Sequence, residues 1–517
     1  MKRNNHIHFI GIGGTAMAAL AVAFKRAGFK ITGSDANTIF PPMSEYLKKN
    51  KIKYHIGFNK NNVGEPNEIV VGNAHYSEKN PEVVYAKENK IELEHFPRLV
   101  EKYLIKKNSV VVAGTYGKTT ITSMTAWLLD KANKKPNYLI GGIPLNFNHG
   151  ARLTFHPASK EQGRGWSVVE GDEYPSASPW DFSPKFKYYH PKYLILTSAE
   201  WDHMDIYKTK QSYLNVFKDL VKSVPRNGLI VAKLDGENLD EVLKKAKCKV
   251  VFYQYHPDDC DKYQGKKGLA GLINKKAIKN KNTILYSVMP EQEDSSLLQF
   301  TMFITTFQDG ICKKIAKFKT QLIGEFNLEN WAAVLALAYE LKIPEKTILD
   351  AVKSFKGVKR RLEIRARLPK KGSMNKASLN RVTIIDDFAH SPSKAKQSVK
   401  ALIRHFPKSR IFVIFEPNRG GRSIKCLKKY NHVFNGVHKV FIPKLTEYKK
   451  KEGVRDVTGQ ELADHLKLTH CLDGGVVYQP DNRKIIAFLF KNTKPGDVIA
   501  FLGSRDFKGM IKELCNS

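Results

Sequence analysis

The stretch SVVVAGTYGKTTITSMTAWLL, residues 109–129, limits most strongly what this chain can fold into. An apolar β-branched run leads into a glycine-containing loop that ends in Lys-Thr-Thr, and a helix-like pattern follows. This order is typical of a phosphate-binding loop between a buried strand and a helix. The loop departs from G-x-x-x-x-G-K-[ST] because Val112 stands at the first glycine position. We therefore expect an α/β domain with a shortened loop that binds a nucleoside triphosphate.

Each part of this loop has a predicted role. Backbone N–H groups would surround the phosphates, Lys118 would neutralise the β and γ phosphates, and the Thr119 hydroxyl would take a Mg²⁺ position. An ordinary strand-turn-helix is the alternative, but GKTT follows an apolar strand directly and opens a helix. The residues predicted to bind ATP here are Gly114, Thr115, Gly117, Lys118, Thr119 and Thr120.

A second glycine loop lies in IHFIGIGGTAMAAL, residues 7–20. Gly11, Gly13 and Ala16 fit G-x-G-x-x-[GA], and Asp35 follows at the end of the next predicted strand. Alone, this pattern would suggest a dinucleotide-dependent dehydrogenase. Beside an ATP loop, it fits better a second nucleotide-linked substrate whose diphosphate lies at the start of the helix.

Acidic and histidine residues follow two later strands, in VVEGDEY and AEWDHMDIY. Mg²⁺ prefers oxygen ligands and keeps several waters, so one or two carboxylates and phosphate oxygens suffice. Glu170 is the first choice for a metal-linked ligand, and His203 belongs to the same series. Each residue alone would also fit a cap or a salt bridge, but their order along the chain favours a site at the strand ends.

The 517 residues predict two or three domains, and the pattern of strands and helices restarts twice. We predict three α/β domains with borders near 105 and 357, namely residues 1–105, 106–357 and 358–517. In the third, Arg361 of RRLE lies near a predicted hinge, and Asp387 ends the strand VTIIDD. Either residue alone would also fit a purely structural role.

The formal charge of +36 comes from 86 Lys and Arg against 50 Asp and Glu. The lysines are scattered singly and in pairs, so we expect a solvated surface that favours anionic small molecules, and no nucleic-acid partner. The six cysteines form no C-x-x-C pair, which predicts neither a metal site nor a disulfide framework and fits a reducing cytoplasm. We also expect no signal peptide and no membrane span.

Several motifs, in this order, give the chain a clear resemblance to the Mur ligases of peptidoglycan metabolism: GTYGKTT, VVEGDEY, DHMD, FNLEN, RRLE and DDFAH. Within that family GIGGTAM, GSDANTIFPPMS, GGIPLNF and KFKYYHP look most similar to the murein peptide ligase branch. The resemblance implies a Rossmann-like domain for the UDP sugar, a central P-loop domain for ATP and a Rossmann-like C-terminal domain. Insertions near 156–165, 255–295 and 369–380 are left over.

The resemblance also implies a reaction. In peptidoglycan recycling, ATP would activate the carboxylate of UDP-N-acetylmuramate as an acyl phosphate. The amine of L-alanyl-γ-D-glutamyl-meso-diaminopimelate would then displace phosphate. The alternative acceptor is L-alanine, in peptidoglycan biosynthesis. We expect ATP and Mg²⁺ as cofactors, and a monomer or a weak dimer in the cytoplasm.

Residue roles follow from the same resemblance. Lys118 and Arg361 would serve the phosphoryl group, and His390 would line the cleft for the incoming amine. The first Mg²⁺ would be held by Thr119 and Glu170, the second by His203, the adenine by Asn327 and Asn330, the ATP ribose by Asp387, and the UDP sugar nucleotide by Gly11, Gly13, Gly14 and Asp35.

The chain departs from the family pattern at some positions. Phe326 replaces the usual histidine before the first adenine-side asparagine, and Tyr116 replaces the usual histidine or asparagine of the ATP loop. Lys218 resembles a position that some Mur ligases carbamylate, although an ordinary surface lysine is the better expectation.

Overall fold

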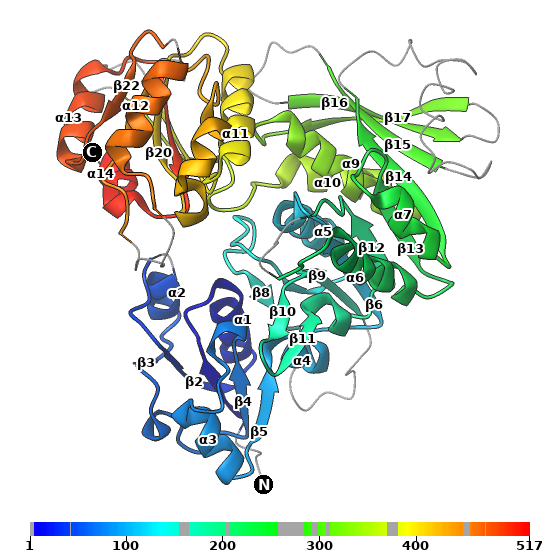
Figure 1. Ribbon diagram of the computed structural model, residues 1–517. Coiled ribbons are helices and arrows are strands. Elements are labelled where there is room, and N and C mark those ends of the chain that lie inside the picture. The colour runs from blue at the N-terminus through cyan, green and yellow to red at the C-terminus, as the bar shows by residue number, and fades with distance from the viewer. Residues whose placement is uncertain are drawn as a thin grey trace. The chain divides into compact units, whose positions relative to one another are not determined.

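The computed structural model of the chain describes residues 5–41, 43–154, 165–201, 206–256, 284–291, 298–306, 311–369, 381–447, 455–470 and 472–516 (Figure 1). It contains two compact units, one made of Met1–Gln321 with Phe326–Lys356, the other of Leu322–Glu325 with Gly357–Ser517. Three α/β sheets confirm the predicted fold class. The domain borders near 105 and 357 stay predictions, and the insertions near 156–165, 255–295 and 369–380 lie largely outside the described residues.

The first sheet belongs to the first unit and has the order β3-β2-β1-β4-β5, with all pairs parallel. The chain places β2 on one side of β1 and β4 on the other, so the carboxyl ends of β1 and β4 form a topological switch point, where α/β sheets bind ligands. Its elements are β1 His6–Ile10, α1 Thr15–Arg26, β2 Lys30–Asp35, α2 Met43–Lys49, β3 His55–Ile56, β4 Glu68–Val71, α3 Pro81–Glu88, β5 Glu92–His95 and α4 Phe96–Tyr103.

The second sheet has the order β17-β16-β15-β14-β13-β12-β6-β9-β7-β8. Its strands from β15 to β7 in this order are parallel, while β16, β17 and β8 join antiparallel. The strands are β6 Asn108–Ala113, β7 Asn137–Leu139, β8 Ala151–Arg152, β9 Trp166–Glu170, β12 Tyr193–Leu196, β13 Leu229–Lys233, β14 Lys249–Tyr255, β15 Ile284–Pro290, β16 Leu298–Thr306 and β17 Ile311–Thr320.

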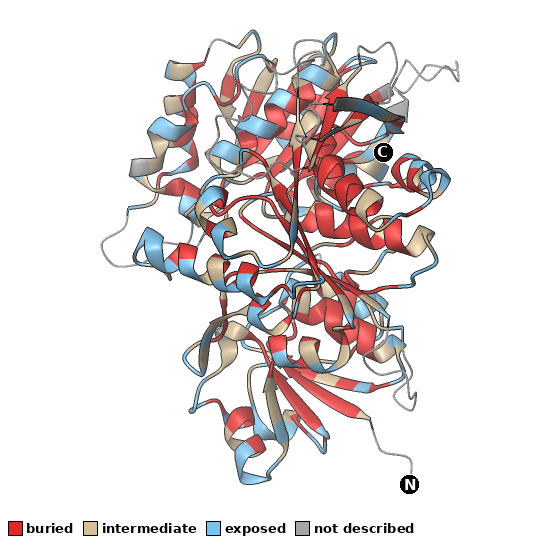
Figure 2. Ribbon diagram, turned by 90° about the vertical axis from the view of Figure 1, so that its right-hand side faces the viewer, coloured by how far each residue is buried: buried red, intermediate tan, exposed pale blue. Residues whose placement is uncertain are grey.

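Helices and one hairpin complete this unit. The helices are α5 Lys118–Lys131, α6 Lys210–Ser223, α7 Leu239–Val242, α9 Glu325–Glu340 and α10 Glu345–Ser354, and the hairpin consists of β10 Pro175–Ala177 and β11 Asp181–Pro184. The strands β6, β9 and β12 are almost continuously buried, as is typical of parallel strands covered on both faces. Figure 2 colours the chain by burial and shows buried residues gathered on strands and on the helix faces beside them.

The third sheet, in the second unit, has the order β18-β19-β23-β20-β21-β22 and is parallel except for β18. Its elements are β18 Glu363–Pro369, β19 Arg381–Asp387, α11 Pro392–His405, β20 Ile411–Glu416, β21 Lys439–Ile442, α12 Gly459–Thr469, β22 Val476–Tyr478, α13 Asn482–Asn492, β23 Val498–Gly503 and α14 Met510–Asn516.

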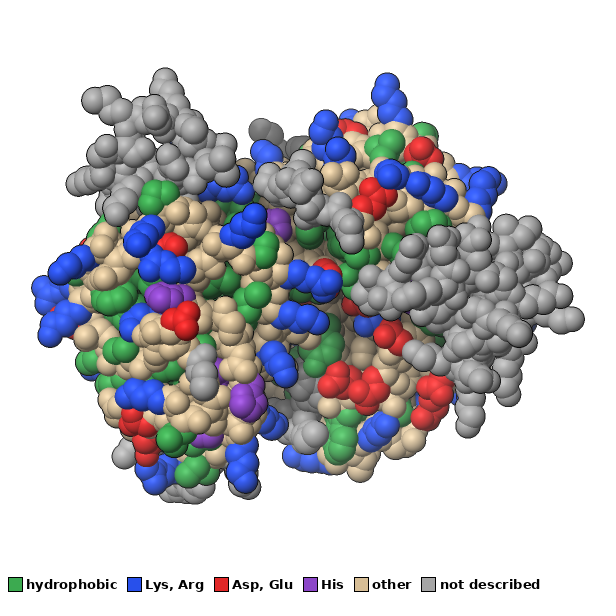
Figure 3. All heavy atoms as spheres, turned by 90° about the horizontal axis from the view of Figure 1, so that it is seen from above, with side chains coloured by type: hydrophobic (Ala, Val, Ile, Leu, Met, Phe, Trp, Pro, Cys, Tyr) green, Lys and Arg blue, Asp and Glu red, His purple; other side chains and the backbone are tan. Residues whose placement is uncertain are grey.

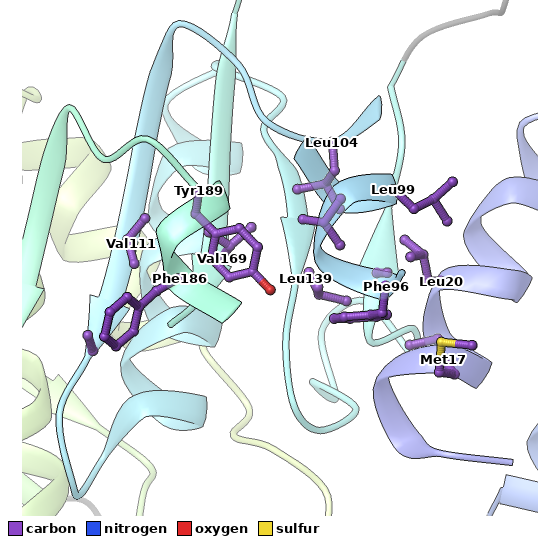
Figure 4. Close-up of a cluster of buried hydrophobic side chains, with 14 of the residues drawn as sticks. Met17, Leu20, Phe96, Leu99, Leu104, Val111, Leu139, Val169, Phe186 and Tyr189 are labelled. Carbon is purple, nitrogen blue, oxygen red and sulfur yellow. The ribbon is translucent and has the colours of Figure 1, made fainter. Parts of the chain in front are cut away.

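One apolar cluster connects the first two sheets (Figure 4). Met17 and Leu20 come from α1 and Phe96 from α4, while Leu139 and Val169 come from the second sheet. All five are buried. The elements that carry the two glycine loops therefore share one core.

The distribution of charged side chains and the apolarity of the helices can both be compared with the sequence predictions. Lys and Arg side chains are scattered among other types over the face in Figure 3, as the sequence suggested. Among the residues described, no helix combines the length and apolarity that crossing a membrane requires.

Candidate active site

The predicted ATP loop joins β6 to α5 and is built around two glycines. Gly114 has φ +117°, and a Cβ there would lie 2.4 Å from Thr197 Oγ1. Gly117 has φ +77°, and a Cβ there would lie 2.6 Å from Asn330 Oδ1. Gly117 is also the N-cap of α5 and gives it no side-chain cap, so the N–H groups of the first turn keep their capacity to bind an anion. The loop geometry thus fits a phosphate.

Lys118 lies folded over its own loop. Its Nζ donates to the Gly114 carbonyl at 2.7 Å and to Glu173 Oε2 at 3.2 Å. Burial acts to lower the pKa of Lys118, but the carboxylates of Glu173, Asp172 and Glu170 outweigh it and raise the pKa. The side chain therefore stays an ammonium group, as charge neutralisation of phosphate requires.

Thr119 and Glu170, the two residues predicted to hold the first Mg²⁺, lie side by side. Thr119 Oγ1 donates to Glu170 Oε1 at 2.9 Å, because β9 pairs with β6 in a register that sets Glu170 beside Val112. Glu170 Oε2 accepts the Gly141 N–H at 2.7 Å. A hydroxyl and a carboxylate at the mouth of a phosphate loop are the hard oxygen donors that Mg²⁺ prefers, so these residues fit the ion.

The other acidic residues of VVEGDEY have different partners. Asp172 Oδ2 accepts from Lys185 Nζ at 2.6 Å; burial acts to raise the pKa of Asp172, but Lys185 and Lys118 lower it. Glu173 pairs with Lys118. His203 lies outside the described residues, and no group of three or more His, Cys, Asp or Glu suited to a metal occurs within them.

The two asparagines predicted for the adenine lie on α9. Both are buried, and Asn330 Nδ2 donates to Asn327 Oδ1 at 3.1 Å. Asn330 also borders Gly117 of the ATP loop. Between them, Glu329 Oε1 lies 2.9 Å from Nζ of Lys233, which ends β13. This ion pair ties α9 to the carboxyl edge of the second sheet.

The first glycine loop lies at the switch point of the first sheet. The Gly13 N–H donates to Asp35 Oδ2 at 2.8 Å, so Asp35 supports the loop itself. Gly11 has φ +82°, and a Cβ there would lie 2.2 Å from Cδ2 of His75. Gly14 is the N-cap of α1 and offers no side-chain cap. The four residues predicted for the UDP sugar nucleotide therefore come together at one helix N-terminus.

In the second unit, Arg361, Asp387 and His390 are near one another. The Arg361 guanidinium lies 5.5 Å from the centroid of Phe388, and His390 Nδ1 lies 2.7 Å from the Phe388 carbonyl oxygen. Asp387 is buried and accepts from Ser398 Oγ. Burial raises the pKa of Asp387 and lowers the pKa of His390 to about 4. His390 is therefore neutral at pH 7.

Sequence reasoning missed several supporting residues. Glu173 and Gly141 were not predicted as partners of Lys118 and Glu170, although the repeated glycine of GGIPLNF was a signal for close packing. Arg360, which precedes the predicted Arg361, binds Asp386 and the carbonyls of residues 503–505. Lys218 forms an ion pair with Glu241.

The fold and the paired glycine loops define a nucleotide-dependent α/β protein, and comparison with known families makes this more specific. The Mur ligase family catalytic domain model matches residues 6–107, the Mur ligase middle domain model residues 112–338, and the Mur ligase glutamate ligase domain model residues 373–505. The chain belongs to the Mur ligase family and is an ATP-dependent, amide-forming ligase.

Individual relatives match over most of the chain. A protein of Clostridium botulinum (strain Hall) named "UDP-N-acetylmuramate--L-alanine ligase" is 27% identical over 512 residues, covering 98% of this chain and 96% of the relative. The structure of UDP-N-acetylmuramate-alanine ligase from Thermotoga maritima has a TM-score of 0.70 at 21% identity and covers 99% and 98% of the two chains. A UDP-N-acetylmuramate:L-alanyl-gamma-D-glutamyl-meso-diaminopimelate ligase structure from Neisseria meningitidis is 28% identical, with a TM-score of 0.52, over 69% of this chain and 99% of that one.

Proposed function

We propose that this ligase joins UDP-N-acetylmuramate to L-alanine in the cytoplasm, acting as a monomer or a weak dimer. The observation that carries the proposal is the full-length match to a relative with this name. It supports the L-alanine alternative better than the tripeptide acceptor that the motifs favoured. The geometry agrees with a two-nucleotide reaction, since one unit contains both a triphosphate loop and a second glycine loop.

The first half-reaction would take place at the loop after β6. Lys118 and the first-turn N–H groups of α5 would hold the β and γ phosphates of ATP. Thr119 and Glu170 would hold Mg²⁺, which would offset the phosphate charge. The lactyl carboxylate would attack the γ phosphorus, giving an acyl phosphate and ADP.

The second half-reaction needs an uncharged amine. Phe388 O can only accept a hydrogen bond, so the hydrogen of the His390 imidazole lies on Nδ1, and Nε2 keeps a lone pair. His390 would line the cleft in which the amine attacks the acyl carbon and phosphate leaves. Arg361 would stabilise the phosphoryl group, Asp387 would bind the ATP ribose, and Asn327 with Asn330 would bind the adenine.

A second candidate acceptor is L-alanyl-γ-D-glutamyl-meso-diaminopimelate. Its support is the 28% identity to the Neisseria meningitidis ligase, together with the motifs of the first and middle regions. This acceptor would change the amine donor and leave the phosphoryl step as it is.

Phosphate release separates the two candidates. Purified protein receives ATP, Mg²⁺ and UDP-N-acetylmuramate, with either L-alanine or the tripeptide as acceptor. Turnover with L-alanine supports the proposal, turnover with the tripeptide alone supports the second candidate, and no turnover with either contradicts both. Omitting UDP-N-acetylmuramate controls for simple ATP hydrolysis.

A further inference from the structure

His75 follows β4 at the switch point of the first sheet. Ile10 and Val71 are paired in the parallel ladder between β1 and β4, and the Gly72 N–H donates to the Ile10 carbonyl at 2.9 Å. The segment after β4 therefore runs beside the glycine loop that follows β1. Ligands of open α/β sheets bind in the crevice outside these two carboxyl ends.

The imidazole of His75 lies against the loop. A Cβ on Gly11 would meet His75 Cδ2 at 2.2 Å and Nε2 at 3.0 Å, so the ring edge that carries Nε2 faces the loop backbone. The ring packs edge-to-face on Phe58, with 5.7 Å between centroids. The backbone is fixed as well, because the His75 N–H donates to the Gly72 carbonyl at 3.0 Å and the His75 carbonyl accepts from Asn80 Nδ2 at 3.3 Å. The position of the ring is thus well defined.

The ring nitrogens of His75 differ from those of the other histidines in this sheet's core. His6 and His8 are buried, and both bond Thr32 Oγ1. His95 is buried, and its Nε2 lies 3.4 Å from Asp181 Oδ2. His75 is half-buried, and neither of its ring nitrogens has a hydrogen-bond partner among the residues that the structure describes. Its polar edge is available to a ligand.

The glycine loop after β1 would gain a hydrogen-bond donor from this edge of the His75 ring. Asp35 occupies the Gly13 N–H, and the N–H groups of Gly11 and Ile12 donate to the Ser34 carbonyl at 2.8 and 3.0 Å, so three amides of the loop already have partners, and a carboxylate lies close to the anion site. A diphosphate at α1 would gain from a donor that is not an amide of the loop. We propose that His75 is a further substrate-binding residue that donates from Nε2 to the diphosphate of the UDP-linked substrate. This inference rests on the proposed function.

Binding of UDP, measured by calorimetry, tests the inference without requiring turnover. His75→Leu removes the donor and keeps an apolar side chain against Gly11, and His75→Gln restores an N–H donor. The matched control is His55→Leu, an exposed histidine of the same sheet. We expect His75→Leu to weaken UDP binding and raise KM for UDP-N-acetylmuramate about tenfold, the effect of losing one hydrogen bond to a charged group. KM for ATP and kcat should change less than about twofold, and His75→Gln should recover part of the loss.

The outcomes separate this inference from the proposed function. Unchanged UDP binding in His75→Leu overturns the role of His75, even if the wild type makes the amide. Equal losses in the Leu and Gln variants, with a lower Tm in both, also overturn it, because they indicate packing alone. A wild type that binds UDP through His75 but forms no amide contradicts the proposed function and supports the inference. A wild type that does not bind UDP overturns both.

Discussion

The two glycine loops of the first unit would both bind phosphate groups, but they differ in the side chains placed beside the phosphates. In the loop after β6, the groups that would face phosphate are side chains already matched to carboxylates, Lys118 to Glu173 and Thr119 to Glu170. In the loop after β1, the carboxylate of Asp35 binds a backbone amide, and the adjacent side chain is the imidazole of His75. The first arrangement suits a metal-bound triphosphate, and the second suits a diphosphate that carries little of the chemistry.

Removing the ammonium group of Lys118 should give the largest difference between the effect on ATP use and the effect on UDP binding. Lys118→Ala is expected to lower kcat/KM for ATP about 1000-fold, since a buried cation on the transferred phosphoryl group is lost. UDP binding should stay within about twofold, as calorimetry would show. The matched control is Lys131→Ala at the other end of α5, where the lysine pairs with Asp350 and little change is expected. An equal loss of UDP binding in Lys118→Ala would contradict the claim that the two loops bind different nucleotides.

The carboxylate of Glu170 is next in expected effect. Glu170→Gln keeps an acceptor for one of its two partners but removes the charge, so the Mg²⁺ concentration for half-maximal phosphate release should rise about tenfold or more. Asp130→Asn, a change of a carboxylate at the far end of α5, is the control. A Mg²⁺ titration that does not move would remove Glu170 from the metal site.

Glycine substitutions compare the loops through stability. Gly114→Ala places a Cβ near Thr197 and the Ser198 backbone at φ +117° and should lower the free energy of unfolding by about 3 kcal/mol. Gly14→Ala has φ −63° and nothing nearer than 3.8 Å, so its free energy of unfolding should change by less than about 0.5 kcal/mol. Denaturant unfolding measures both. Similar losses in the two variants would show that position 14 tolerates a side chain no better than position 114.

Acid should weaken the second unit through His390. Folding lowers the pKa of His390 to about 4, so the unfolded chain takes up a proton that the folded chain excludes. The stability from the neutral ring is complete above about pH 6.5 and is lost as the pH falls toward 4. We expect His390→Asn to reduce the fall in unfolding free energy between pH 7 and pH 5 by about 1 kcal/mol. An unchanged pH dependence would contradict the burial of this ring.

The smallest effect is expected at the ion pair beside the adenine-side asparagines. Lys233→Met should raise KM for ATP about threefold and leave kcat unchanged, because Glu329 loses its anchor on β13 while the phosphate loop is intact. Lys249→Met breaks an exposed pair with Glu340 and serves as the control. A change in kcat without a change in KM would show that this pair acts elsewhere in the reaction.

The sequence predicted the parts of the site that depend on local order. A buried strand, two glycines and GKTT predict a phosphate loop, and Glu170 could be placed beside Thr119 because neighbouring parallel strands end at one edge. His75 could not be found in this way, since its contact with Gly11 depends on the path of the chain after β4. Nor could the sequence show that the adjacent Arg360 and Arg361 have different contacts. A turn with φ +58° at Arg360 directs the two guanidinium groups, so that Arg360 binds Asp386 and Arg361 lies over Phe388.

The acceptor was the least predictable feature for a physical reason. The motifs that form the ATP loop act through backbone geometry, which few sequences satisfy, whereas acceptor choice depends on a few side chains around a cleft. The segment EPNRGGRSIK of the second unit contains an arginine whose contacts are structural. Arg422 is buried, pairs with Glu416 and donates to two carbonyls, so it supports the carboxyl end of β20.

The most direct test of the account is mass spectrometry of the product formed from UDP-N-acetylmuramate, L-alanine, ATP and Mg²⁺. The account predicts one molecule each of UDP-N-acetylmuramoyl-L-alanine, ADP and phosphate per turnover, and formation of all three about 1000-fold slower with Lys118→Ala. ATP hydrolysis that proceeds equally without UDP-N-acetylmuramate, and yields no amide with L-alanine or with the tripeptide, would contradict it.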